Sequence, residues 1–234
     1  MNPRVQAGTA AALLFAAAAA GAADAPAWRE DFRELPKGAE TKGKPGTPAA
    51  VFEVADVKEA EDGRALRMTA DKASASFFLP VDGVDLRRTP VVRWRWRVTE
   101  FPAGADGRDA AKDDQAIGIY LGTGGLFGKT SLAWRWETDT PVAATGTASY
   151  AAGVVKVHWI GLRNREGGAD FVVEERNVAD DWKAHVGSDL PKSFTLSVSC
   201  NSQYTGTKAA AELDWIEFRP ATNAAPDRAP HGAP

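Results

Sequence analysis

The sequence contains little of what metal, redox and covalent catalytic chemistry uses. Its 234 residues include one cysteine, Cys200, and three histidines. One cysteine excludes an intrachain disulfide, and these few residues show no zinc-ligand spacing. P-loop, zinc and Gly-x-Ser-x-Gly motifs are also missing. We therefore expect no cofactor, and we expect Cys200 to be a small, buried apolar residue.

The chain also lacks an excess of charge of one sign. Its 28 Lys and Arg are balanced by 31 Asp and Glu, for a formal net charge of -3, and the two signs are interspersed. Nucleic acid is therefore not an expected partner, because such proteins carry a basic stripe. The hydrophobic fraction of 44% and the charged fraction of 25% are typical of a globular protein with a packed core.

Long apolar runs are confined to the N-terminal end. A short positive segment precedes an Ala/Leu/Phe stretch over about residues 10–20, which predicts a cleavable secretory signal over 1–23. The stretch is too short for a comfortable membrane span, although an uncleaved anchor is the alternative. We expect a periplasmic or extracellular protein with no span after cleavage. One domain is expected over 24–220, followed by a disordered Ala/Pro-rich tail over 221–234.

Alternation of apolar and polar residues dominates the middle of the chain and predicts half-buried strands. The clearest examples are 92–98, 132–138 and 155–159. Further strands are expected at 51–54, 65–69, 74–79, 115–121, 171–173, 194–200 and 213–218, with one short helical turn within 178–187. The pattern favours an all-β, two-sheet antiparallel β-sandwich of the jelly-roll type, like concanavalin or galactose-binding domains. An eight-stranded lipocalin-like barrel is the alternative.

An ordered series of short motifs resembles the bacterial DUF3047 family, whose function is unknown. The segments are 94–98, 102–106, 112–114, 174–178, 181–182, 185–187, 205–206 and 214–218. This resemblance covers roughly residues 28–220 and implies an exported jelly-roll domain, with no activity to carry over. The chain departs from the family at 201–204, where Asn-Ser-Gln-Tyr replaces an acidic stretch, which weakens any role that needs those charges.

Eight tryptophans are candidates for both the core and a ligand platform. Burying each ring contributes about 4–6 kcal/mol gross, so most of them belong in the core. The predicted core tryptophans are Trp94, Trp96, Trp134, Trp136 and Trp215. Trp159 and Trp182 lie near predicted loops and are candidates to stack on a sugar, with help from Tyr120 and Tyr204.

Arginines alternate with these tryptophans and carry the second part of the predicted site. We expect Arg95 and Arg135 to bind carboxylates or acidic sugars in one concave groove, with Trp159 and Glu175. The alternative is a solvated face held by structural ion pairs. The predicted ligand-binding residues are Arg95, Tyr120, Arg135, Trp159, Glu175, Arg176, Asn177 and Trp182.

Adjacent carboxylates at Asp113 and Asp114 are candidate calcium ligands. Calcium takes six to eight oxygen ligands, so backbone carbonyls would have to complete the site. Neighbouring residues of a strand point to opposite faces, so both bind one ion only from a loop. Roles in capping and turns are the alternative.

Together these features predict an exported, non-catalytic β-sandwich protein that binds a glycan or another component of the cell envelope, such as a protein. One alternative is a carbohydrate-active hydrolase or lyase that uses carboxylates in a sheet groove. Another is an envelope scaffold without a small ligand, which would show a large apolar patch. The sequence leaves the ligand and the oligomeric state open.

Overall fold

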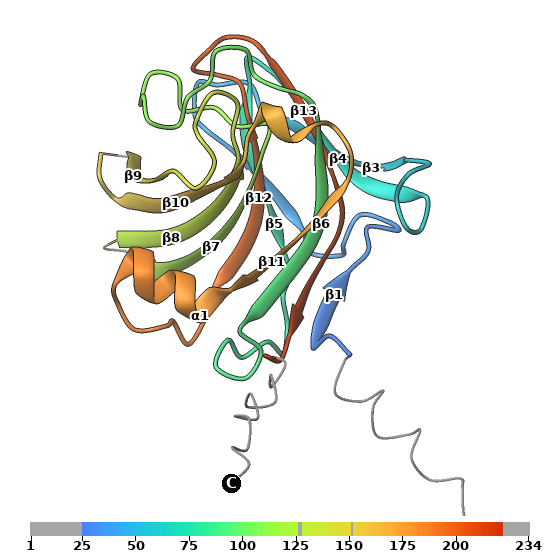
Figure 1. Cartoon of the computed structure of the whole chain (residues 1–234), viewed down its shortest axis with the longest axis vertical. Coiled ribbons are helices and arrows are strands. Elements are labelled where there is room, and N and C mark those ends of the chain that lie inside the picture. Colours follow the sequence, from blue (N-terminus) through green and yellow to red (C-terminus); the bar gives the residue numbers. More distant parts are fainter. Residues whose placement is uncertain (1–24, 126–127, 151, 222–234) are drawn as a thin grey trace, which may run out of the picture.

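The computed structural model describes residues 25–125, 128–150 and 152–221, which form two facing β-sheets (Figure 1). The predicted signal over 1–23 and all but one residue of the predicted tail over 221–234 lie outside the described residues. Among the described residues, no helix is both long enough and apolar enough to cross a membrane.

The first sheet, sheet A, is built mainly from strands that are far apart in the sequence. Its order is β11-β6-β13-β4-β3, and β1 pairs with one end of β13. All of its pairs are antiparallel. The strands are β1 (Trp28–Glu30), β3 (Val51–Asp56), β4 (Arg64–Asp71), β6 (Val91–Glu100), β11 (Val172–Asn177) and β13 (Lys208–Arg219).

The second sheet, sheet B, has the order β2-β5-β12-β7-β8-β10-β9. Its strands are β2 (Glu40–Gly43), β5 (Ser74–Leu79), β7 (Ile117–Gly125), β8 (Gly128–Trp136), β9 (Thr145–Tyr150), β10 (Val155–Arg163) and β12 (Thr195–Asn201). One pair, β8 with β10, is parallel. In the sheet, β10 lies between β8 and β9, and it pairs antiparallel with β9. The β8–β10 pair is the exception to the antiparallel prediction.

The core lies between the sheets and is centred on four tryptophans. Trp94 and Trp96 of β6 face Trp134 and Trp136 of β8, and all four are fully buried. The ring centroids of Trp94 and Trp134 are 5.5 Å apart, and those of Trp96 and Trp136 are 5.6 Å apart. Aromatic contacts at this spacing add to the free energy gained from burial. The core assignment of these tryptophans is confirmed.

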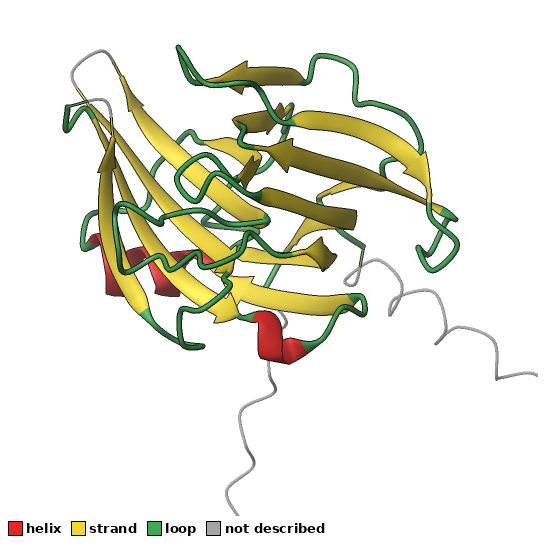
Figure 2. Ribbon diagram, turned by 90° about the horizontal axis from the view of Figure 1, so that it is seen from above, coloured by secondary structure: helices red, strands yellow, loops and turns green. Residues whose placement is uncertain are grey.

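The two-layer arrangement in Figure 2 confirms the predicted sandwich, and the alternative of a single closed barrel is wrong. Cys200 is buried in the core as predicted, and burial raises the pKa of its thiol. The predicted helical turn is present as α1 (Val178–Asp181) and the π-helical turn η2 (Trp182–Val186). A short 3-10 turn, η1 (Arg165–Gly167), follows β10.

Candidate functional site

The two arginines that were predicted to share a groove lie on opposite outer faces of the sandwich. Each one alternates with core tryptophans, Arg95 along β6 and Arg135 along β8. Because successive side chains of a strand point to opposite faces, Arg95 points outward from sheet A and Arg135 outward from sheet B. The core therefore separates them. This corrects the expectation of one groove that combines Arg95, Arg135, Trp159 and Glu175.

The outer face of sheet A holds ion pairs between neighbouring strands. Arg95 of β6 pairs with Asp214 of β13, and its guanidinium carbon lies 4.5 Å from the ring centroid of Phe171. Glu175 of β11 pairs with Arg93 of β6 at 3.1 Å. Asp214 is only 2% exposed, so the arginine covers and neutralises it. These contacts satisfy the charges within the sheet and support the structural interpretation of Arg95 and Glu175.

Arg135 lies on the outer face of sheet B between two aromatic rings. Its neighbours on the adjacent strands are Gly118 of β7 and Gly161 of β10; the Tyr120 ring fills the space beside Gly118, and Glu137 packs beside Gly161. The rings of Tyr120 and Trp159 come from the next row of residues, and their centroids lie 5.8 and 5.3 Å from the guanidinium carbon. The structure therefore brings together three of the predicted residues.

Two carboxylates complete this group, which we call the Arg135 cluster. Asp113 accepts hydrogen bonds from Arg135 at 2.8 Å and from Gln115 at 2.7 Å, and the hydroxyl of Tyr150 donates to its other oxygen. Glu137 Oε1 lies 3.8 Å from the same Nη1 atom of Arg135. Sequence reasoning missed Gln115 and Tyr150, since no local pattern links β9 to the start of β7.

The charged centre of the Arg135 cluster is buried, whereas its two tyrosines, Tyr120 and Tyr150, are partly exposed. Arg135 and Glu137 are fully buried, and Trp159 is 3% exposed. Backbone covers the cluster, because an added Cβ at Gly146 would lie 2.4 Å from the Trp159 ring and one at Gly107 would lie 2.9 Å from the Glu137 carboxylate. This corrects the expectation that Trp159 offers an open ring face. The cluster instead attaches the loop around Gly107 to sheet B, next to the edge strand β9 that contains Gly146.

Burial also sets the protonation behaviour of this cluster. It raises the pKa of Glu137, and the nearby Arg135 charge opposes that rise only in part. Burial likewise raises the pKa of the hydroxyls of Tyr120 and Tyr150. Arg135 faces both carboxylates, so its charge offsets part of the cost of burying them.

The remaining predicted residues lie beside α1, away from the Arg135 cluster. Arg176 pairs with Asp181, and the side chain of Asn177 caps α1 by accepting from two backbone N–H groups. Trp182 is 1% exposed, and its indole N–H donates to Ser188 at 3.2 Å. Trp182 is therefore a core residue here, which corrects its assignment as a platform, and Arg176 and Asn177 have local structural partners.

Asp113 and Asp114 point to different partners, as expected for neighbouring residues. Asp113 belongs to the Arg135 cluster, whereas Asp114 accepts from the backbone N–H of Thr205 at 2.7 Å and from its hydroxyl at 2.9 Å. The structure does not bring the two carboxylates to one ion. Among the described residues, no group of three or more Asp, Glu, His and Cys has an arrangement that would hold a metal.

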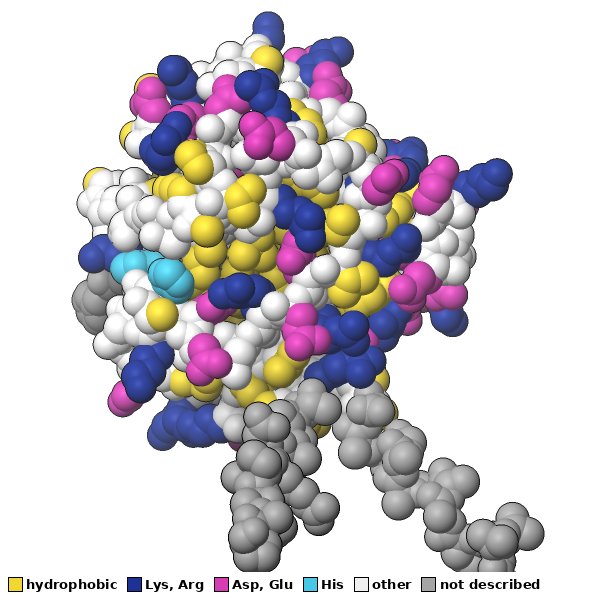
Figure 3. Space-filling model, viewed as in Figure 1, with side chains coloured by type: hydrophobic (Ala, Val, Ile, Leu, Met, Phe, Trp, Pro, Cys, Tyr) yellow, Lys and Arg dark blue, Asp and Glu magenta, His cyan; other side chains and the backbone are white. Residues whose placement is uncertain are grey.

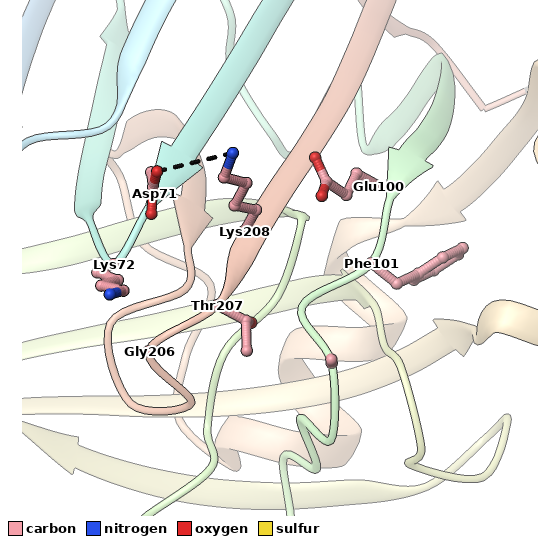
Figure 4. Close-up of a pocket in the computed structure, with 8 residues that line it drawn as sticks. Asp71, Lys72, Glu100, Phe101, Gly206, Thr207 and Lys208 are labelled. Atoms are coloured by element: carbon pink, nitrogen blue, oxygen red, sulfur yellow. Dashed lines mark ion pairs between the residues drawn. The ribbon is translucent and has the colours of Figure 1, made fainter.

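An open hollow of about 450 Å³ lies where β4, β6 and β13 meet their turns (Figure 4). Asp71 and Glu100 supply carboxylates, whereas the ring of Phe101, a lining residue, packs against Trp136 and is turned away from Thr207 and Lys208 in Figure 4. Lys208 lies between these two carboxylates in Figure 4 and pairs with Asp71 at 3.9 Å. We call this the first hollow; it is lined by Asp71, Lys72, Glu100, Phe101, Ala103, Gly206, Thr207 and Lys208.

A directed chain of hydrogen bonds ends at the first hollow. Because an ionised carboxylate only accepts, the Thr205 hydroxyl donates its proton to Asp114. Thr205 must then accept from the Thr207 hydroxyl, which lies 2.8 Å away. Thr207 therefore keeps its oxygen lone pairs for a donor in the hollow. A ligand hydroxyl is such a donor.

A second hollow of about 320 Å³ adjoins the first one at Lys72. Its lining residues are Lys44, Gly46, Thr47, Pro48, Lys72, Gln203 and Tyr204. Lys44 places its ammonium 4.9 Å from the ring centroid of Tyr204. Tyr204 is the one predicted aromatic assistant that lines an open site. The sequence motifs nearest to the two hollows are the turns at 102–106 and 205–206, which belong to the family-like motifs.

The fold defines this chain as a two-sheet β-sandwich protein. The chain is similar to endoglucanase 3 of family GH12 from Trichoderma harzianum, with a TM-score of 0.41, 8% identity, and coverage of 80% of this chain and 100% of that chain. It is also similar to the CBM22-1 xylan-binding domain of Xyn10C from Paenibacillus barcinonensis, with a TM-score of 0.37, 13% identity, and coverage of 84% and 96%.

A family model described as a protein of unknown function, DUF3047, matches residues 48–217. The chain belongs to the DUF3047 family, which confirms the resemblance seen in its motifs. None of the curated proteins compared with the sequence matches it.

Proposed function

We propose that this protein is an exported, non-catalytic β-sandwich that binds a glycan, or another hydroxyl-rich component of the cell envelope, in the first hollow. The observation that carries the proposal is that Thr207, which keeps its oxygen lone pairs, shares one open site with the carboxylates of Asp71 and Glu100. The hydroxyl groups of a sugar are donors that suit these acceptors.

The rest of the first hollow suits the same class of ligand. Asp71 and Glu100 add acceptors, while Lys72 and Lys208 add donors. The turn that carries Thr207 is positioned by Asp114, which is fully buried. Side chains with buried support hold their geometry, which reduces the ordering cost of binding.

Calcium is a proposed accessory ion at Asp114 rather than at the Asp113–Asp114 pair. Oxygen Oδ1 of Asp114 is buried and has no hydrogen-bond partner among the described residues. A buried, unsatisfied carboxylate oxygen is a candidate to accept an ion or a water. Calcium is therefore supplied in the binding test below, with a chelator control.

A hydrolase or lyase is the second candidate, because two carboxylates, Asp71 and Glu100, line the first hollow. Glycoside hydrolysis needs an acid and a base or nucleophile at opposite sides of the bond. Asp71 is instead paired with Lys208, and the Asp113–Glu137 pair is closed off by backbone. Release of new reducing ends from a bound glycan would favour this candidate over the non-catalytic one.

The scaffold alternative is less well supported by the surface. The large hydrophobic residues exposed in the described part of the chain lie on different elements: Leu35, Val51, Val142, Val154 and Val173. On the face drawn in Figure 3, charged side chains of both signs are interspersed with hydrophobic ones. Scattered apolar residues of this kind need no partner protein.

The test is a glycan-array screen of the protein from Asp24 onward, with calcium present. We expect reproducible binding to one class of glycan. Replacing Phe101 with Ala or Thr207 with Val is expected to weaken binding at least about tenfold, which corresponds to ~1.4 kcal/mol. Thr145→Val is the matched control, since Thr145 is exposed on β9 and lines neither hollow.

A blank array, or binding that survives both substitutions in folded protein, would overturn the proposal. Circular dichroism of each variant checks the fold, because Phe101 also packs against Trp136 at a centroid distance of 6.4 Å. Thr207→Val retains that contact and is therefore the decisive variant if Phe101→Ala unfolds.

A further inference from the structure

The two adjoining hollows differ in their charge. Two carboxylates, Asp71 and Glu100, line the first hollow together with two lysines. The second hollow is lined by Lys44 and Lys72, and no carboxylate is among its described lining residues. The first hollow is thus balanced, whereas the second is cationic. A ligand that spans both would meet acceptors at one end and ammonium groups at the other.

Lys72 stands at the boundary between the hollows, on a turn that is fixed from both sides. Its backbone N–H donates to the carbonyl of Thr207 at 2.9 Å, on the side of the first hollow. Two residues further on, the N–H of Ser74 donates to the carbonyl of Pro48 at 2.9 Å, on the side of the second hollow. The hollows are therefore held next to each other by backbone hydrogen bonds.

Lys72 also has a backbone conformation that is costly for its residue type. Its φ is +52°, in the left-handed region that residues with a Cβ rarely adopt. Such a conformation persists only where the surrounding structure fixes it. Lys72 occupies the left-handed position of the β4–β5 turn, and this exposed residue lines both hollows.

Lys44 is the second cation of this hollow, and an aromatic ring holds it in place. Its ammonium lies 3.5 Å from the Tyr204 hydroxyl as well as over the Tyr204 ring. Neither contact neutralises its charge, because the phenol is a neutral group. The side-chain amide of Gln203 adds further donors beside the two lysines. Ammonium and amide donors around one hollow suit an anionic group.

We infer that the second hollow binds an anionic substituent of the glycan whose neutral ring occupies the first hollow. The substituent is a carboxylate, a sulfate ester or a phosphate ester, which share negative charge and oxygen acceptors. This inference rests on the proposed glycan binding and adds the class of ligand: an acidic oligosaccharide of at least two units, with its acidic unit next to Lys44 and Lys72.

The test uses oligogalacturonides of one to six units, their methyl esters, and sulfated and phosphorylated glycans on the same array. We expect the acidic forms to bind and the methyl esters to bind more weakly. The double variant Lys44→Met/Lys72→Met should lower affinity for the acidic ligand about five- to thirtyfold, and affinity for its neutral counterpart, which meets only Lys72 of this pair, should fall by a clearly smaller factor. Affinity for the acidic form should also fall as salt is added.

The matched control is Lys183→Met/Lys192→Met, which removes two exposed lysines that line neither hollow. Array hits that are all neutral would overturn this inference and leave the proposed function standing. Equal loss in the control and in the double variant would also overturn it, because net charge alone would then explain binding. A blank array would overturn both proposals.

Discussion

The Arg135 cluster and the two hollows use similar side chains for opposite purposes. In the cluster, an arginine and two carboxylates are buried beside two tyrosines, and Asp113 pairs with Arg135 and Tyr150, although Arg135 Nε and Glu137 Oε1 have no hydrogen-bond partner among the described residues. In the hollows, lysines and carboxylates stay open to solvent, and Asp114, which is buried, positions the turn that carries Thr207. Residue type therefore does not identify a ligand site. The distinguishing property is whether the charged groups are open to solvent in the folded chain.

Removal of the central cation should show that the Arg135 cluster is structural. Arg135→Met leaves Asp113 and Glu137 buried without a counter-charge, so the free energy of unfolding should fall by about 3–5 kcal/mol. Urea unfolding measures this. Arg108→Met is the control, because the Arg108 side chain is 55% exposed and solvent screens its pair with Asp106, so this variant should lose much less stability. Equal losses in the two variants would remove the distinction between cluster and surface.

The pH dependence of stability should reveal Glu137. Because the folded protein raises the pKa of Glu137 above its ordinary value of 4.5, the folded state keeps a proton that the unfolded chain releases. The unfolding free energy should therefore fall as pH rises above 4.5, until the folded-state pKa is passed. Glu137→Gln should lose this dependence, so that the two stability curves diverge by about 1–3 kcal/mol. Parallel curves would mean that Glu137 is ionised throughout.

At the boundary of the hollows, stability and binding should change in opposite directions. Lys72→Gly relieves the left-handed strain but adds chain entropy, so unfolding free energy should rise by up to about 1 kcal/mol. Affinity for an acidic glycan should fall at the same time. Lys72→Met is the control that removes the ammonium and keeps the strain. A loss of stability in Lys72→Gly would show that the side chain itself stabilises the turn.

The smallest effect on stability is expected at Lys44. Lys44→Met removes an exposed ammonium and its contact with Tyr204, which is worth less than about 1 kcal/mol in unfolding free energy. Its loss should appear in affinity for acidic ligands rather than in thermal or urea unfolding. If Lys44→Met unfolds as readily as Arg135→Met, then the second hollow is part of the packed structure and not an open site.

Period-two alternation placed Trp94, Trp96, Trp134 and Trp136 in the core, because side-chain direction in a strand is a local property. The core prediction was wrong for Trp215, which follows a register shift in β13 and lies on the outer face of sheet A beside Arg29 and Arg93. Alternation also placed Arg95 and Arg135 outward, but it could not say from which sheet. Sheet membership depends on pairing between distant strands, such as β6 with β13 and β7 with β12. The prediction of one groove shared by Arg95 and Arg135 was wrong because the two residues belong to different sheets.

Other features were missed for similar reasons. β9 consists of small and polar residues around Thr145–Tyr150, which carry little strand signal, yet it covers the Arg135 cluster. The hollows combine turns near residues 46, 72, 102 and 205, and no local pattern links these segments. The only signals were the family-like turn motifs, whose spatial proximity became evident in the structure.

The most direct test of the central claim is an amide chemical-shift titration by NMR with the glycan that binds most strongly on the array. The account predicts that shifts are concentrated at residues 71–72, 100–103 and 203–208, around the two hollows. Shifts concentrated instead at Gly118, Tyr120, Ala133 and Trp159, on the outer face of sheet B, would contradict it. That result would show that the Arg135 cluster opens to bind the ligand.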